Sequence, residues 1–200
     1  TTNFNLAGTL YTRHANGISV TGTLANTGTK VLGANSIVAY DRLLAEGDQQ
    51  FTSRTDYANV HIYGGSQKIL NGPATMSGNL TLSNGLVVTT TVNLLTITAT
   101  GSSFGGNNNS FVTGPLRKIG NAAFVFPVGK LVGATNHYRT ITISAPDNVA
   151  DEFTAEFVRG NARLLGGGLI TAPGLQRVSQ CEYWTLDHIN SGAATAVNVT

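Results

Sequence analysis

The feature that most constrains the fold of this chain is a succession of short runs in which apolar residues alternate with Thr, Ser or Asn. Such runs occupy residues 17–24, 59–64, 78–82, 85–89 and 93–98. Alternation with a period of two is typical of β-strands that bury one face. Glycine and asparagine separate the runs, as in the Asn16-Gly17 and Asn84-Gly85 pairs, which favour tight turns.

Strands this short cannot bury a hydrophobic face alone, but strands stacked as rungs share a continuous inner column of apolar side chains. We therefore expect residues 1–104 to form a short right-handed β-solenoid. Residues 41–56 interrupt the pattern and are expected to form a short helix or a loop that leaves the solenoid. An ordinary antiparallel sandwich is the alternative, because hairpins use the same Asn-Gly turns.

The character of the sequence changes after a Gly- and Asn-rich break at residues 101–110. Five of the eight phenylalanines follow this break, together with the one tryptophan, Trp184. The alternation of Phe153, Ala155 and Phe157 with polar residues predicts a half-buried antiparallel strand. We expect an all-β chain in which residues 105–200 form a β-sandwich module truncated at its C-terminal end, and we expect the chain to be part of a longer protein.

The composition excludes several classes of protein. Glycine accounts for 24 of the 200 residues, and charged residues make up only 11%. A helical bundle needs better helix formers than this, and disorder is not expected of a chain that is 41% hydrophobic. Twelve Lys and Arg against ten Asp and Glu give no basic surface for nucleic acid. No apolar run reaches the length of a membrane span, and the single Cys181 cannot form a disulfide within the chain.

Several segments resemble a module of large cell-surface proteins of gliding Bacteroidota that are exported by the type IX secretion system. In the second half these segments are 110–120, 124–129, 138–143 and the Cys-Glu-Tyr-Trp-Thr-Leu-Asp run at 181–187. Residues 57–64 are similar to the β-helical stretch that often precedes the module. The resemblance covers about residues 55–200, whereas residues 1–54 fit it loosely.

The resemblance implies an extracellular, cell-surface location and a role in adhesion or gliding motility. It implies interactions with the secretion machinery and attachment to the outer membrane through parts outside this segment, and it supplies no catalytic residues. The C-terminal sorting domain of the family is not visible in the segment. Expected partners are surface glycans or solid surfaces, and self-association is left open.

Two groups of residues are candidate binding sites. Tyr183 and Trp184 are candidate glycan contacts, because sugar sites use exposed aromatic faces. Asp147, Asp151 and Glu152 are candidate calcium ligands, since calcium takes six to eight oxygen ligands, although they lack the spacing of a known calcium loop and a plain polar turn is the favoured interpretation. No other metal, cofactor or catalytic residue is expected.

We expect a non-catalytic structural and adhesive segment of a large secreted surface protein. The alternatives are a carbohydrate-binding module and a polysaccharide lyase or hydrolase on the same solenoid. An enzyme of that kind needs paired carboxylates across a cleft, and the first half offers only the acidic group at residues 41–56. A solvated loop is the simpler interpretation of that group.

Overall fold

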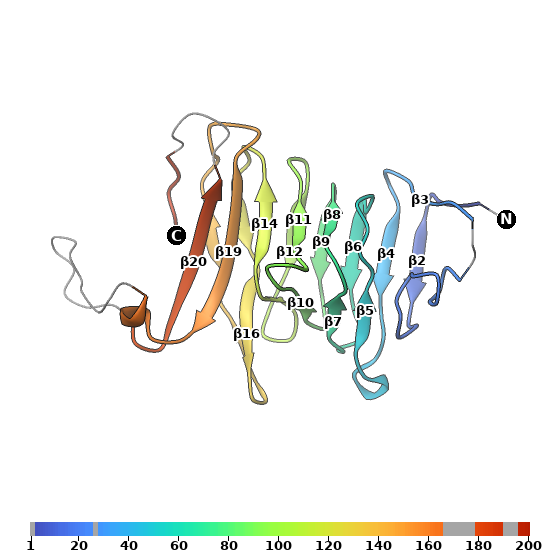
Figure 1. The fold of residues 1–200 in the computed structure, drawn as a ribbon, viewed down its shortest axis with the longest axis horizontal. Coiled ribbons are helices and arrows are strands. Elements are labelled where there is room, and N and C mark those ends of the chain that lie inside the picture. The colour runs from blue at the N-terminus through green and yellow to red at the C-terminus, as the bar shows by residue number, and fades with distance from the viewer. Residues whose placement is uncertain (1–2, 26–27, 166–178, 190–195) are drawn as a thin grey trace.

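The structure is a computed structural model, and it describes residues 3–25, 28–165, 179–189 and 196–200. Within these ranges the strands wind into a stacked-coil β-solenoid of about five turns. Successive turns follow one another along the long axis of the molecule (Figure 1). The predicted all-β class and the predicted solenoid are confirmed.

Three sheets form the walls of the solenoid. The first sheet contains, in spatial order, the parallel strands β2 (Thr9–Thr12), β4 (Ile37–Tyr40), β6 (Asn59–Ile62), β9 (Asn79–Leu82) and β12 (Ser102–Gly105). The second contains β5 (Gln49–Phe51), β7 (Lys68–Leu70), β10 (Val87–Val88), β13 (Val112–Thr113) and β16 (Val128–Val132), followed by the antiparallel β17 (Thr135–Tyr138). The third contains β8 (Ala74–Met76), β11 (Leu95–Ile97) and β14 (Leu116–Ile119), followed by the antiparallel β19 (Glu152–Arg159) and β20 (Glu182–Ile189).

Smaller elements complete the fold. Strand β1 (Phe4–Leu6) pairs parallel with β3 (Lys30–Leu32), and β15 (Phe124–Phe126) pairs antiparallel with β18 (Ile141–Ile143). The helical elements in the described ranges are single-turn 3₁₀ helices, η1 (Leu44–Glu46) and η2 (Ala162–Leu164). None of the described helices has the length and apolar character needed to cross a membrane.

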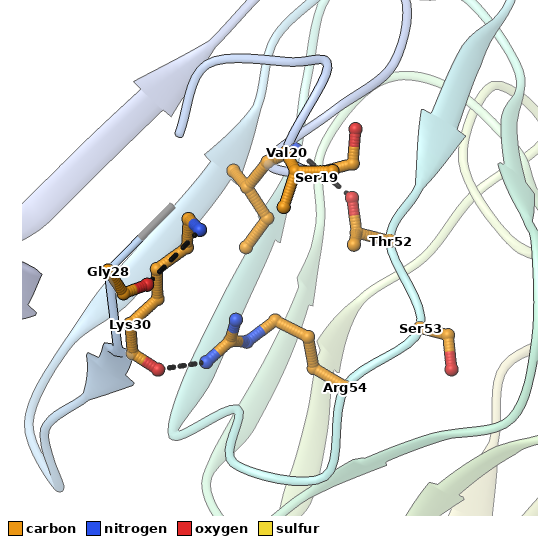
Figure 2. A pocket seen from close by; sticks show the side chains of 8 residues that line it. Ser19, Val20, Gly28, Lys30, Thr52, Ser53 and Arg54 are labelled. Atoms are coloured by element: carbon orange, nitrogen blue, oxygen red, sulfur yellow. Dashed lines mark hydrogen bonds between the residues drawn. The ribbon is translucent and has the colours of Figure 1, made fainter. Parts of the chain in front are cut away.

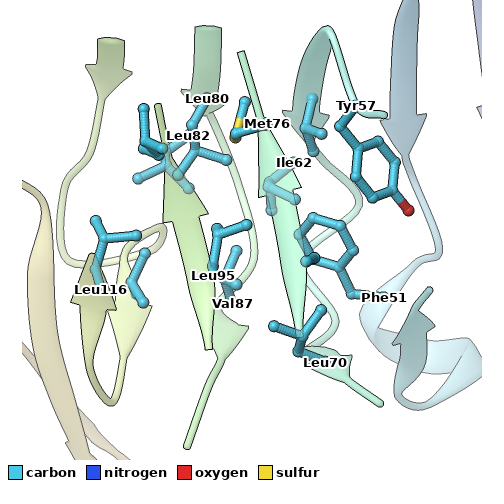
Figure 3. Close-up of a cluster of buried hydrophobic side chains, with 14 of the residues drawn as sticks. Phe51, Tyr57, Ile62, Leu70, Met76, Leu80, Leu82, Val87, Leu95 and Leu116 are labelled. Atoms are coloured by element: carbon cyan, nitrogen blue, oxygen red, sulfur yellow. The ribbon is translucent and has the colours of Figure 1, made fainter. Parts of the chain in front are cut away.

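Alternate side chains of the strands fill the interior of the solenoid in columns (Figure 3). Leu95 lies in register between Ala74 and Leu116, and all three side chains are buried. On the first sheet, Val60 stacks on Leu80 in the same way. A three-residue strand thus contributes two inward side chains and one outward side chain, which explains why such short runs suffice.

The predicted β-sandwich is not confirmed, because the strands after residue 105 extend the walls of the solenoid. Strands β13 and β14 pair parallel with β10 and β11, so the ladders continue across residues 101–110. Strands β17 and β19 then pair antiparallel with β16 and β14. The alternation at Phe153, Ala155 and Phe157 does form a strand, β19, but its first partner is a strand of the solenoid. The division of the chain at residue 104 stays a prediction.

Residues 17–24 were predicted to form a strand, and this prediction is wrong. They form turns in which the Gly22 N–H donates to Ser19 O and the Thr23 N–H donates to Gly17 O. Gly17 has a φ of +58°, a backbone conformation that starts a chain reversal and not a strand. The apolar residues of the run, Ile18 and Leu24, are nevertheless buried, since the turns pack against the rung formed by β4 and β5.

Two lysines interrupt the apolar interior, and both use backbone carbonyls as partners. The Lys68 ammonium donates to Arg42 O at 3.0 Å and to Ser66 O and Oγ at 3.2 and 2.7 Å. Lys118 continues the column of Met76 and Ile97, and its ammonium donates to three carbonyls of the turn at residues 98–101. Each lysine therefore supplies several donors to backbone carbonyls at a corner between two strands.

Burial lowers the pKa of the Lys68 ammonium from 10.5 to about 8, and it also lowers the pKa of Lys118. Between about pH 8 and 10 the unfolded chain keeps a proton that folded Lys68 releases, so stability should rise with pH in this window. Urea unfolding at several pH values should show this slope, and Lys68→Met should reduce it, with Lys118 supplying the remainder. Ile69→Met, at the exposed neighbour of Lys68 on β7, is the matched control, because it changes no ionisable group and should keep the wild-type slope. A slope unchanged in Lys68→Met would contradict the assignment.

Candidate functional site

The candidate glycan residues Tyr183 and Trp184 lie on β20 and point to opposite faces of its sheet, since side chains alternate along a strand. Trp184 is in register with Phe157, with ring centroids 5.5 Å apart. Its indole N–H donates to Arg139 O at 3.3 Å, and the residue is 39% exposed. The two aromatic rings therefore do not form one platform: Trp184 is partly exposed on one face of the sheet, and half-buried Tyr183 lies on the other.

The candidate calcium ligands also point to separate partners. Asp147 is exposed, whereas Asp151 is buried with His188 Nε2 3.4 Å from its Oδ1. Glu152 forms an ion pair with Arg117 at 3.0 Å. In the ranges that the structure describes, no group of three His, Cys, Asp or Glu side chains is arranged to hold a metal ion. Calcium binding stays a prediction, and the geometry gives it no common centre at these three residues.

In the acidic segment that follows β4, the side chain of Arg42 holds the loop together through hydrogen bonds to backbone carbonyls. Arg42 donates from Nε to Gly47 O at 3.1 Å, from Nη1 to Arg13 O at 2.8 Å, and from Nη2 to Glu46 O. The Glu46 carboxylate accepts the N–H of Leu43, and Asp41 pairs with Arg13 at 3.1 Å. These carboxylates have internal partners and do not face each other across a cleft, as a glycosidase pair would.

A hollow of about 390 Å³ lies beside the turns at residues 17–24 (Figure 2). Lys30 and Arg54 give it a positive lining, and Arg54 Nη2 donates to Lys30 O at 2.8 Å. The same guanidinium forms two bonds with Asp56, at 2.6 and 2.8 Å. Because Arg54 bridges β3 and Asp56 in this way, we interpret it as a clamp that holds the β1–β3 pair to the solenoid.

A second arrangement on the outer face of the first sheet joins neighbouring rungs. The His61 ring contacts the Tyr63 ring at a tilt of 39°, with centroids 3.7 Å apart, and its Nε2 lies 2.9 Å from Ser83 Oγ. Partial burial lowers the pKa of His61 and so favours the neutral imidazole. A nucleophilic serine also needs a group that orients the histidine and donors for an oxyanion. Among the described residues no carboxylate bonds to His61, and the contact with Ser83 joins two neighbouring rungs.

A further hollow runs along the corner between the first and second sheets, with a volume of about 330 Å³. We call it the corner groove. Its polar lining consists of four side-chain amides, three from the turns before β7, β10 and β13 and one from β17, and its apolar lining is aliphatic. The amides are those of Gln67, Asn84, Asn109 and Asn136, and the aliphatic residues include Leu44, Leu86 and Leu131. Sequence reasoning missed this groove, and the only signal for it was the repeated Asn and Gly at the turns.

Comparison of the chain with protein-family models, with curated proteins and with solved structures finds no significant match.

Proposed function

We propose that this chain is a non-catalytic structural and adhesive segment of a large secreted cell-surface protein. The observation that carries the proposal is the continuous stacking of short rungs in three sheets around one apolar column. Each rung pairs its backbone with the next, which makes such a stack stiff along its axis. Its outer face carries many Thr, Ser and Asn side chains, which form weak hydrogen bonds and keep the surface neutral.

Adhesion by such a surface rests on repetition. One weak contact per chain becomes a strong attachment when many copies engage the same polymer or solid. The resemblance to surface modules of gliding Bacteroidota supports an extracellular location and export by the type IX system. The lack of a facing pair of carboxylates in the acidic segment favours adhesion over the lyase or hydrolase alternative.

The test compares the chain in single and in multiple copies. Beads coated with the 200-residue chain should adhere to polysaccharide-coated surfaces, whereas the same chain free in solution should bind them weakly. Emission from Trp184 should report at the same time whether glycan reaches β20. Beads that fail to adhere to every polysaccharide and mineral surface tested would contradict the adhesive role. Release of reducing ends or unsaturated sugars would establish the enzyme alternative.

A further inference from the structure

We infer that the corner groove binds a neutral polysaccharide chain, laid along the axis of the solenoid. This inference rests on the proposed adhesive function and names the ligand class and the residues for it. The groove begins at η1 and Gly64–Gly65, passes Asn84 and Asn109, and ends at the β16–β17 hairpin. Its volume lies within the usual range of ligand pockets, roughly 300–1,000 Å³.

The lining of the groove matches hydroxyl groups. A primary amide has both donors and an acceptor, as a sugar hydroxyl does, so one amide can bind two neighbouring hydroxyls. The side chains of Gln67, Asn84 and Asn109 form no hydrogen bond with other described residues. Asn136 Oδ1 also has no hydrogen-bond partner there, but it is shielded from solvent. Three amides in the groove, those of Gln67, Asn84 and Asn109, therefore remain available to a ligand.

The charge of the lining argues for a neutral ligand. No Asp, Glu, Lys or Arg is among the residues that line the corner groove, in contrast to the hollow lined by Lys30 and Arg54. Aliphatic side chains such as Leu44 and Leu131 supply the apolar surface on which the C–H face of a pyranose ring rests. An acidic polysaccharide would gain no ion pair here.

The spacing of the amides argues for a polymer. Neighbouring rungs of a sheet are about 4.8 Å apart, so the five strands from β7 to β17 span about 19 Å. This length accommodates a few linked pyranose rings, with amides at the β7, β10, β13 and β17 levels and Leu131 at the β16 level. Gly65, with a φ of +84°, keeps the floor open, since a Cβ there would contact the Asn84 amide and Leu44 at 3.4 and 3.5 Å.

An extended peptide fits the groove less well. Peptides that add to a sheet need an edge with unpaired backbone groups. Here the corner backbone is already paired from rung to rung, with the Gly65 N–H donating to Asn84 O and the Gly85 N–H donating to Asn109 O. The groove therefore offers side-chain amides and aliphatic surface, and not a free backbone edge.

The test uses the full chain and soluble neutral oligosaccharides, namely the hexasaccharides of β-1,3-glucan, β-1,4-glucan, mannan and xylan. We expect one of them to shift the side-chain amide signals of Asn84 and Asn109 in NMR spectra. The double variant N84A/N109A should weaken binding about tenfold or more, because each lost side-chain hydrogen bond lowers affinity severalfold. N79A is the matched control, since Asn79 is an exposed asparagine at the opposite end of β9, and it should bind as the wild type does.

Coated beads separate failure of this inference from failure of the proposed function. Wild-type beads that adhere to a neutral polysaccharide while N84A/N109A beads detach support the groove. Equal adhesion of both beads, adhesion to acidic polysaccharides alone, or a preference for a neutral Gly-Ser-Thr peptide would overturn the groove and leave an adhesive segment. Wild-type beads that adhere to nothing would overturn both. Unchanged thermal unfolding of the double variant shows that its fold is intact.

Discussion

Leu95→Ala should lower the free energy of unfolding by about 2–5 kcal/mol, the usual range for a buried leucine. Leu95 is fully buried, and it lies in register between Ala74 on one rung and Leu116 on the next. The small side chain of Ala74 cannot fill the cavity that the substitution leaves. Because each rung contacts only its neighbours, the cavity weakens the stacking on both sides of β11. Urea unfolding followed by far-UV circular dichroism measures the loss.

Thr96→Ala, one residue further along β11, is the matched control. Thr96 points outward in register with Thr75 and Arg117, and its replacement should change stability by no more than about 0.5 kcal/mol. Similar losses of stability in the two variants would contradict the assignment of Leu95 as inward and Thr96 as outward.

Trp184 fluorescence in the same experiment tests the division of the chain at residue 104. Since β19 pairs with β14, we expect the fluorescence and dichroism transitions to coincide.

The first half of the solenoid could be predicted because its signal is local. The alternation at Leu80 and Leu82 corresponds to strand β9, and that at Val60 and Ile62 corresponds to β6. The same rule failed at residues 17–24, where Ile18 and Leu24 are buried by turns and not by a strand. Apolar spacing alone does not distinguish these two ways of burying a residue.

The strands that pair with the later strands could not be predicted from the alternation of apolar and polar residues. Phe153, Ala155 and Phe157 indicate a strand with one buried face, but a sandwich and a solenoid extension both satisfy that pattern. Lys118 is a further case, because a lysine is expected outside and here continues a column of apolar residues. Its burial depends on carbonyls of the preceding turn, at Thr98, Ala99 and Gly101, which only the folded corner brings together.

The candidate site could be predicted from the sequence even less well than the pairing of the later strands. Tyr183 and Trp184 are adjacent in sequence, and adjacency in a strand places them on opposite faces. The corner groove instead takes Gln67, Asn84 and Asn109 from separate turns of the solenoid. These amides come together only because of the number of residues in each turn of the solenoid. No single sequence motif therefore predicts the groove.

Gly64→Ala should destabilise the chain more than Gly47→Ala, although both glycines have a similar backbone conformation. Their φ angles are +78° and +82°, and an alanine in this region costs about 1–2 kcal/mol. A Cβ at Gly47 would meet no atom within 4 Å, whereas a Cβ at Gly64 would lie 2.2 Å from Arg42 O and 2.5 Å from Asp41 O. The backbone of Arg42 must therefore move in Gly64→Ala, which should cost about 1–3 kcal/mol more, as overpacking does elsewhere.

The movement also disturbs the corner that Lys68 holds, which gives the comparison a second readout. Arg42 O accepts the hydrogen bonds of Ser66 Oγ at 2.9 Å and of Lys68 Nζ at 3.0 Å. If Arg42 O is displaced, the buried ammonium loses an acceptor and its charged form becomes less favourable. Gly64→Ala should then make the rise of stability with pH begin below about pH 8, while Gly47→Ala keeps the wild-type pH profile. Equal losses of stability and equal pH profiles would show that the carbonyl of Arg42 is free to move, and that the close approach at Gly64 does not hold the corner in place.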